Sequence, residues 1–199
     1  MINRILNYFD ELIPNPKCEL NYCNDFEFLI AVVLSAQTTD YKVNLVTKEL
    51  FKCDIKNTKI EDINNIIKPI GMSLKKSYYV KSIDNYVSKY GIPKTKDELL
   101  KLDGVGNKTA NLVLSTLYNE PYFAVDTHVT RVTKRLGLVN DNDSVLEIEK
   151  KMYKLISKNL LNRTHHQFVL FGRYYCTSRN PKCKECKLKE ICKYYKINN

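Results

Sequence analysis

The sequence lacks the features of a membrane or secreted protein. No long uncharged apolar run occurs in its 199 residues, so we expect no membrane-spanning helix. The first residues, Met1 to Arg4, are not followed by the apolar core of a signal peptide. Internal repeats and low-complexity linkers are also absent. These absences predict a soluble protein that works inside the cell.

Strand patterns are almost absent as well, whereas helix patterns recur along the whole chain. Asp40 is expected to cap one helix, and the Thr-x-x-Glu and Ser-x-x-Glu pairs that begin at Thr95 and Ser144 predict capping boxes. Gly91 and Gly137 mark helix ends. The expected helices cover 26–36, 41–52, 75–90, 96–102, 110–117, 127–136, 145–157 and 166–173. We expect the last of these to lead into the C-terminal cysteines, and the fold class to be all-α.

Acidic residues are outnumbered by basic ones. The chain has 32 Lys and Arg against 22 Asp and Glu, a formal charge of +10 and a pI near 9.1, which favours a polyanionic partner or an acidic membrane surface. Residues 163–199 hold nine basic and two acidic side chains, so this segment carries 9 − 2 = +7 of that charge. Most charged runs are solvated faces, but interleaved tyrosines make this one a better candidate for binding nucleic acid. Its candidate phosphate contacts are Lys182, Lys184, Lys187 and Lys189.

The seven cysteines are unevenly spread. Four lie close together in the pattern Cys-x6-Cys-x2-Cys-x5-Cys: Cys176, Cys183, Cys186 and Cys192. Without a secretory signal a disulfide framework is not expected, and four clustered thiols in a reducing compartment indicate a metal centre. Zinc and iron–sulfur are the candidates, although zinc ribbons use two short Cys-x-x-Cys pairs and only one is present. The remaining three, Cys18, Cys23 and Cys53, are expected to have no ligand role.

The segment from Leu102 to Asp126 carries the candidate chemistry. Gly104, Val105 and Gly106 form a Gly-x-Gly turn, Lys108 follows it, and Asp126 lies 18 residues after the lysine. A glycine turn that opens a helix presents unpaired N–H groups at the positive end of the helix dipole, which suits a phosphate. The spacing fits neither a Walker loop nor a Rossmann turn. An ordinary helix–helix turn with glycine at a C-cap is the alternative.

Further similarities, to known protein families, support the interpretation of this turn as a phosphate site. Leu102 to Ala110, reading LDGVGNKTA, resembles the helix-hairpin-helix of the DNA glycosylase superfamily, and Val125 to His128 resembles the segment with its catalytic aspartate. The hairpin lysine, the segment Leu34 to Asp40 (LSAQTTD) and the cysteine spacing are similar to those of the endonuclease III family. The resemblance covers nearly the whole chain.

The resemblance implies a helix-hairpin-helix glycosylase fold of two helical lobes. One lobe would be a continuous helical domain over 18–120. The other would be discontinuous, joining 1–17 to 121–199, and would carry a [4Fe–4S] cluster on its C-terminal cysteine loop. The family also implies a substrate cleft between the lobes, with Lys108 on one wall and Asp126 on the other.

The implied activity is that of a bifunctional DNA glycosylase and AP lyase in base excision repair. Such an enzyme excises oxidised pyrimidines from double-stranded DNA and nicks the strand at the abasic site by β-elimination. Lys108 would form a Schiff base with the sugar, and Asp126 would stabilise positive charge or accept a proton. We expect a monomer with damaged double-stranded DNA as its partner, cytoplasmic and nucleoid-associated in a prokaryote.

Further residues match the family less specifically. Gln37 and Met72 occupy positions whose side chains enter the gap left by a flipped nucleotide, although core packing would explain Met72 equally well. Thr39 and Asp40 would line the pocket or cap a helix. Asp103 and Asn107 stand where the family usually has proline and a basic residue. A carboxylate beside a phosphate site and the loss of one basic contact are both expected to weaken DNA binding.

Two other functions stay open at this point. The related adenine-mismatch glycosylases share the hairpin and the cluster, but they carry a residue other than lysine at the position of Lys108 and have an additional C-terminal domain. A non-catalytic DNA-binding or redox-sensing module would use the hairpin for phosphate and the cluster as a switch. Borohydride trapping on abasic DNA separates a catalytic lysine from a binding module.

Overall fold

The computed structural model describes residues 1–198 and contains helices and no strand within that range. The all-α fold class is therefore confirmed. The α-helices are α1 (Ile2–Leu12), α2 (Asp25–Leu34), α3 (Asp40–Leu50), α4 (Ile60–Ile67), α5 (Ser73–Tyr90), α6 (Lys96–Leu99), α7 (Asn107–Leu117), α8 (Thr127–Leu136), α9 (Val145–Leu155), α10 (Leu161–Tyr174) and α11 (Lys193–Asn198). Two short 3-10 helices, η1 (Lys158–Leu160) and η2 (Cys183–Glu185), complete the set.

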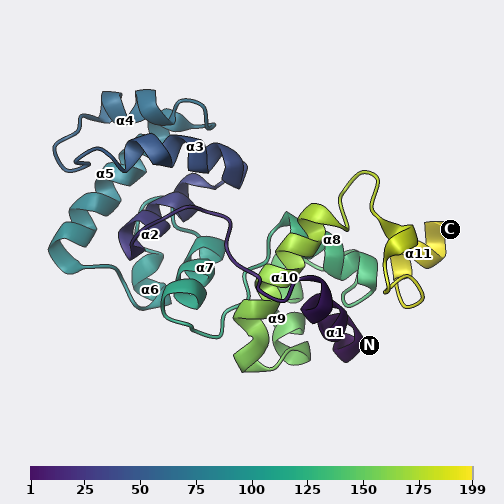
Figure 1. Cartoon of the computed structure of the whole chain (residues 1–199). Coiled ribbons are helices and arrows are strands. Elements are labelled where there is room, and N and C mark those ends of the chain that lie inside the picture. The colour runs from purple at the N-terminus through teal and green to yellow at the C-terminus, as the bar shows by residue number, and fades with distance from the viewer. Residues whose placement is uncertain (199) are drawn as a thin grey trace. The chain divides into compact units, whose positions relative to one another are not determined.

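The chain divides into two compact units (Figure 1). Unit 2 is continuous and covers Glu19–Asn119, from α2 to α7. Unit 1 joins Met1–Cys18 to the residues from Glu120 onward, so α1 packs with α8 to α11 although unit 2 lies between them in the sequence.

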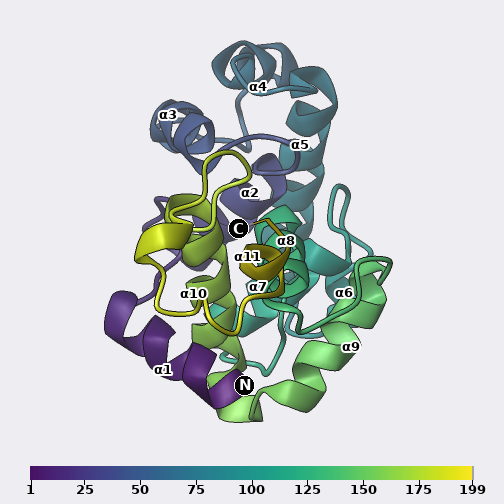
Figure 2. The ribbon, with the colours of Figure 1, turned by 90° about the vertical axis from the view of Figure 1, so that its right-hand side faces the viewer.

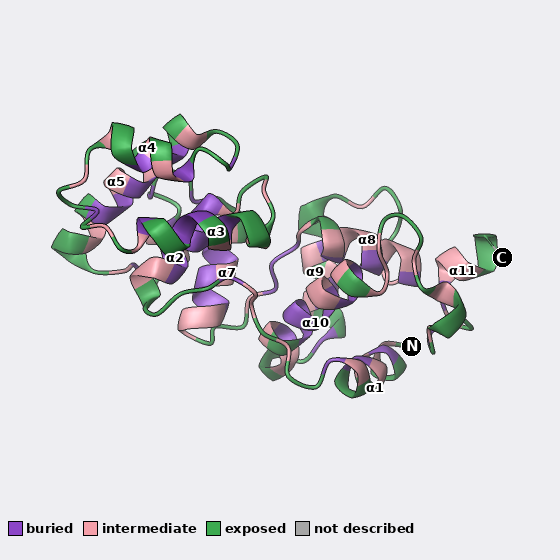
Figure 3. Cartoon of the chain, turned by 45° about the horizontal axis from the view of Figure 1, so that its top comes forward, coloured by how far each residue is buried: buried purple, intermediate pink, exposed green. Residues whose placement is uncertain are grey.

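Unit 2 is built around α2. The residues from Phe28 to Leu34 are all buried, as the nearly continuous apolar sequence predicts, whereas the first turn of the helix is exposed or half-buried (Figure 3). Asn24 caps the helix by accepting a hydrogen bond from the Glu27 N–H at 2.9 Å. Helices α5, α7 and α3 pack against α2, which places it at the centre of the unit.

The other helices of unit 2 follow the sequence signals with several differences. Helices α5 and α7 begin at Ser73 and Asn107, earlier than expected, and at Thr95 only the bond from the Glu98 N–H to the hydroxyl is present of the expected capping box. Helix α5 ends at Gly91, whose φ of 77° gives the expected stop. The cap of α3 is Thr39 and not Asp40, because the Thr39 hydroxyl accepts from the Lys42 N–H and Asp40 is already helical. Helix α6 ends at Leu99, three residues earlier than expected. Helix α4, which packs against α5 (Figure 2), was not predicted.

Unit 1 is built around the contact between α8 and α10. A Cβ on Gly172 of α10 would lie 2.9 Å from the Cβ of His128, so glycine lets the two helices approach closely. Helix α1 runs beside α10 (Figure 2) and inserts Phe9 between Phe168 and Phe171, with ring centroids 5.0 and 4.8 Å apart. This helix was not predicted, and its partner lies at the opposite end of the chain.

The remaining sequence signals in unit 1 are confirmed in part. The Ser144–Glu147 capping box is present in full, and Gly137 ends α8 with a φ of 75°. Helix α10 begins at Leu161, five residues before the expected start, and α11 follows the cysteines, so α10 is not the last helix. Within residues 1–198, no helix is long and apolar enough to cross a membrane.

Candidate functional sites

The glycine hairpin connects α6 to α7. Gly104 has a φ of 78°, a conformation that side chains other than glycine rarely adopt, and Gly106 is the N-cap of α7. The first intrahelical bond runs from the Ala110 N–H to the Gly106 carbonyl, so the N–H groups of 107–109 have no partner within the helix. The C-cap of α6 is Leu100, which means that the alternative of Gly104 as an ordinary C-cap is wrong.

The hairpin is docked on the side of α5. A Cβ on Gly104 would overlap the ring of Tyr79, so the glycine permits the hairpin backbone to rest directly on this tyrosine. The Asp103 carboxylate accepts a hydrogen bond from the Ser82 hydroxyl at 2.6 Å. Val105 is buried beneath the turn. The carboxylate that departs from the family pattern thus serves to hold the hairpin to α5.

Lys108 and Asp126 both lie at helix N-termini. Lys108 is exposed in the first turn of α7 in unit 2, where the helix dipole disfavours a positive charge. Asp126 is half-buried at the N-cap of α8 in unit 1, and its Oδ1 accepts from the Val129 N–H at 2.7 Å. The segment before Asp126 is held by the Phe123 N–H, which donates to the Tyr153 hydroxyl at 3.2 Å.

Two arginines on α8 hold the cysteine loop, residues 176–192, against that helix. Arg131 donates from Nε to the Cys176 carbonyl at 3.0 Å and from Nη2 to the Gly172 carbonyl at 2.6 Å. Arg135 donates to the Thr177 carbonyl at 2.6 Å, and its Nη1 lies 3.5 Å from the Cys176 Sγ. Sequence reasoning missed both residues. Their i, i+4 spacing on the helix that begins after Asp126 was the available signal.

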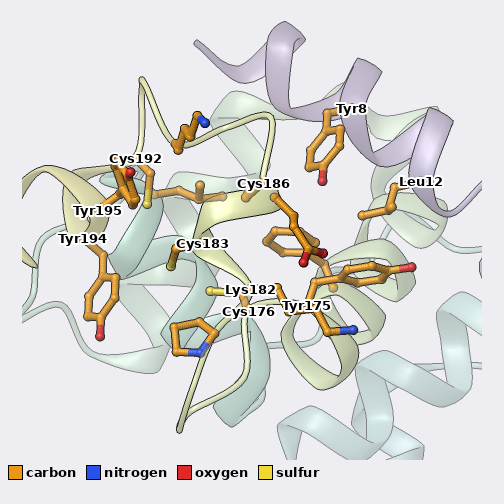
Figure 4. Close-up of a pocket in the computed structure, with 15 residues that line it drawn as sticks. Tyr8, Leu12, Tyr175, Cys176, Lys182, Cys183, Cys186, Cys192, Tyr194 and Tyr195 are labelled. Atoms are coloured by element: carbon orange, nitrogen blue, oxygen red, sulfur yellow. The ribbon is translucent and has the colours of Figure 1, made fainter. Parts of the chain in front are cut away.

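The four clustered cysteines line one cavity of about 140 Å³ in unit 1. Figure 4 shows the cysteines around this cavity with Tyr8, Tyr175 and Tyr194 among its walls. The cavity brings together residues from α1, the end of α10, η2 and the start of α11. The other three cysteines do not line it.

The chemistry of the cavity fits a cationic group held by thiolates. Burial raises the pKa of the Cys183 and Cys186 thiols, and the neighbouring cysteines raise it further, so thiolates here need a cationic group to balance them. In the described part of the chain, no group of three His, Cys, Asp or Glu side chains is close enough together to hold a single metal ion.

The four lysines of the cysteine loop are exposed, but they differ in their contacts. The Lys187 Nζ lies 2.6 Å from a Glu11 carboxylate oxygen. The Lys182 ammonium is 5.2 Å from the centre of the Tyr175 ring, and Lys189 donates to the Lys184 carbonyl at 3.5 Å. The charge of Lys187 is therefore partly neutralised by α1.

Gln37 and Met72 share an unusual backbone geometry. Both are exposed, and their φ angles are 57° and 60°. Met72 is 50% exposed at the N-cap of α5, so the interpretation as a core residue is wrong.

The chain matches one family model and several known proteins. Residues 30–158 match the family model described as HhH-GPD superfamily base excision DNA repair protein. The chain is 42% identical over 196 residues to the endonuclease III of Bacillus subtilis (strain 168), covering 94% of this chain and 90% of the relative.

Two solved structures are similar over almost the whole chain. One is a trapped endonuclease III–DNA covalent intermediate in an estranged-adenine complex, with a TM-score of 0.92, 42% identity and coverage of 99% of this chain and 98% of that chain. The other is a non-covalent endonuclease III–DNA complex, with a TM-score of 0.93, 43% identity and coverage of 98% and 95%.

Proposed function

Because the chain belongs to the endonuclease III family of the HhH-GPD superfamily, we propose that Lys108 is its nucleophile and Asp126 its catalytic carboxylate. This membership confirms the family that the hairpin, the lysine and the cysteines predicted. The protein is a bifunctional DNA glycosylase and AP lyase of base excision repair. Its proposed substrates are oxidised pyrimidines and abasic sites in double-stranded DNA, and it is proposed to act as a monomer.

Lys108 forms and then releases a covalent bond to the sugar of a nucleotide that has been rotated out of the duplex. Its neutral amine attacks C1′, the bond from C1′ to the base breaks, and the base leaves with the electron pair and takes up a proton. The sugar ring then opens to a positively charged Schiff base. This group withdraws electrons from C2′, so loss of a C2′ proton expels the 3′ phosphate. Hydrolysis by water frees the lysine.

Asp126 supplies negative charge to the same reaction. Positive charge develops on the sugar as the base leaves, and a fixed carboxylate stabilises that charge without reorganising. It also offers an acceptor for a proton of the attacking amine. The hydrogen bond from the Val129 N–H to Oδ1 orients the carboxylate, so capping and catalysis are compatible.

The hairpin and the two positive-φ residues are proposed to bind the DNA. The unpaired N–H groups at the start of α7, presented by the turn Gly104, Val105 and Gly106, suit one backbone phosphate. Gln37 and Met72 are proposed to fill the gap that the extruded nucleotide leaves, because both are exposed and lie on short turns of unit 2. The lysines of the cysteine loop add electrostatic attraction.

The cavity in unit 1 is proposed to hold a [4Fe–4S] cluster through Cys176, Cys183, Cys186 and Cys192. When bound, the cluster supplies iron–thiolate bonds that cross-link the loop. Arg135 lies beside Cys176 and places positive charge next to the thiolate set. This proposal rests on the shared cavity, the raised pKa values of the Cys183 and Cys186 thiols, and the family spacing.

The observation that carries the proposal is the position of Lys108, exposed in the first turn after the hairpin of a chain similar to a covalently trapped relative. Borohydride trapping on a duplex with one abasic site provides the test. The wild-type protein is expected to give a covalent adduct, and Lys108→Gln none, while both bind the duplex. An adduct of equal yield from Lys108→Gln would refute the assignment. Lys101→Gln, a change to an exposed lysine on the other side of the turn, is the matched control.

A further inference from the structure

Lys76 is a buried lysine that the proposed chemistry does not use. The residue is 2% exposed near the start of α5. Its ammonium donates to two backbone carbonyls, that of Leu34 at 2.9 Å and that of Ala36 at 2.8 Å. Burial lowers the pKa of Lys76, which reflects the cost of holding a cation there. An apolar side chain of similar length would fill the space without that cost, so the two carbonyl contacts are what a lysine adds.

These contacts lie next to Gln37 and Met72, the two wedge residues, which are proposed above to fill the gap left by the extruded nucleotide. Leu34 is the last residue of α2, whose final carbonyls have no partner within the helix, and Ala36 directly precedes Gln37. The backbone N–H of Lys76 donates to the Met72 carbonyl at 2.9 Å. A single residue therefore binds the peptide before Gln37 through its side chain and Met72 through its backbone.

Both wedge residues hold a backbone conformation that needs external support. Within residues 1–198, the non-glycine residues with positive φ are Gln37, Met72, Asn119 and Asn180. Asparagine tolerates this region comparatively well, whereas glutamine and methionine pay a strain of about 1 kcal/mol or more. Strained residues of this kind persist only where neighbouring contacts hold them. For Gln37, the hydrogen bond from the Lys76 ammonium to the preceding Ala36 carbonyl is such a contact. For Met72, the corresponding contact is the bond from the Lys76 backbone N–H, and the Lys76 side chain fixes the start of α5, which carries it, to the end of α2.

We propose that Lys76 is a positioning residue that sets Gln37 and Met72 at the spacing needed to fill the gap left by the extruded nucleotide. The inference rests on the wedge role proposed above for these two residues. Lys76 touches neither the sugar nor the base, and acts through the turn after α2 and the first turn of α5.

Helix α5 extends this arrangement to the phosphate-binding hairpin. Met72 is its N-cap, and Lys76 lies one turn later. Tyr79 and Ser82 follow on the same helix and hold Gly104 and Asp103 of the hairpin. The single 18-residue helix α5 therefore holds two elements in place. These are the hairpin proposed to bind the DNA backbone and the residues proposed to enter the base stack.

The test compares strand cleavage at an abasic site in a duplex with cleavage of the same strand without its complement. Only the duplex has an opposite base and a gap that wedge residues must fill. Lys76→Met keeps the length of the side chain and removes its donors. We expect its single-turnover rate to fall about 10- to 100-fold on the duplex, as small displacements of positioning groups do. The rate on the single strand should change little. Equal losses on both substrates, or no loss on the duplex, would overturn the proposal.

Lys81 provides a matched control in the same helix. Its ammonium also donates to two backbone carbonyls, those of Ile55 and Lys56, each at 2.8 Å. That loop carries neither wedge residue. Lys81→Met is therefore expected to lower the melting temperature as Lys76→Met does, without changing the ratio of duplex to single-strand rates. If Lys81→Met changes the ratio as much as Lys76→Met, the effect is general loosening of unit 2 and the proposal fails.

Variants of the wedge residues separate this inference from the function on which it rests. Gln37→Ala and Met72→Ala should each lower the duplex rate, and Lys76→Met should add nothing in the background of both. If neither alanine variant affects the duplex rate, the wedge assignment fails and the role of Lys76 fails with it. If the alanine variants lower the rate and Lys76→Met adds its full effect to theirs, the wedge assignment stands and the role of Lys76 is refuted.

Discussion

At the residue scale, Asp126 combines an observed structural contact with a proposed chemical one. Its side chain caps α8 through the Val129 N–H, which alone would explain an aspartate at this position. The two roles make different demands on the side chain. A cap needs an oxygen acceptor, and asparagine supplies one about as well as aspartate, whereas charge stabilisation needs the carboxylate.

Asp126→Asn should therefore separate the roles. We expect the free energy of unfolding to stay near the wild-type value, and the base-excision rate to fall about 10²- to 10³-fold, because a preorganised charge is lost. Some borohydride adduct should still form, since the amine of Lys108 is retained. Single-turnover excision and denaturant unfolding are the measurements.

A second cap in the same unit controls for helix stability. Ser144→Ala removes the capping hydroxyl of α9, which should cost about 1 kcal/mol of stability without slowing excision. Asp126 would be a cap alone if Asp126→Asn excised at the wild-type rate.

At the scale of the element, the cysteine loop is tied to helices on several sides. Arg135 of α8 donates to the Thr177 and Ser178 carbonyls, and Arg4 of α1 lies 2.7 Å from a Glu190 carboxylate oxygen. Lys187 pairs with Glu11 of α1. Exposed pairs of this kind contribute little stability each, but they reduce the charge that Lys187 offers to DNA.

Because Lys187 is already paired with Glu11, we expect it to contribute less to phosphate binding than the other three lysines of the loop. We expect the substitutions that weaken DNA binding to be among Lys182→Gln, Lys184→Gln and Lys189→Gln. Each of these should weaken binding to damaged and undamaged duplex by a similar factor. For each true contact, the slope of log K against log salt should become shallower by about 0.9. Lys187→Gln, already paired, should change the slope least. Binding titrations from low to moderate salt provide the measurement, and four unchanged slopes would mean that the charge is only a solvated face.

At the scale of the whole molecule, the cavity is where widely separated parts of unit 1 meet. Its walls include Tyr8 of α1, Phe171 of α10 and Tyr194 of α11. Leu188 inside the cysteine loop is buried in the unit's core. A group that cross-links the four cysteines would therefore stabilise the packing of the N-terminal helix as well as the loop.

We expect the purified protein to be yellow-brown, to absorb near ~400 nm and to contain about four iron atoms per chain. Cys186→Ser should lower soluble yield and unfolding temperature because a ligand to the cavity is lost, while the protein that still folds keeps its Lys108 trapping activity. Iron analysis and absorption spectra check the first part. Cys53→Ser, which changes a cysteine outside the cavity, is the control. Colourless protein with stoichiometric zinc would contradict the cluster.

Features that depend on residues within one or two helical turns of one another could be predicted from the sequence. The Ser144–Glu147 capping box, the stop at Gly137 and the buried run of α2 all appear as predicted, because each depends on hydrogen bonds or burial over a few neighbouring residues. The family likewise followed from local motifs, the hairpin at Gly104 and the cysteine spacing. Where two neighbouring residues can both cap a helix, the sequence does not decide between them. Asp40 was expected to cap α3, and Thr39 is the cap.

Contacts between residues distant in the sequence were decided only by the tertiary structure. The bond from Lys76 to the Leu34 carbonyl spans 42 residues, and nothing near Lys76 in the sequence distinguishes it from the adjacent Lys75. The pairing of Lys187 with Glu11 spans 176 residues and depends on α1 packing beside the end of the chain. Such contacts arise from how helices pack, and packing depends on shape and burial across the whole unit, which no local pattern encodes.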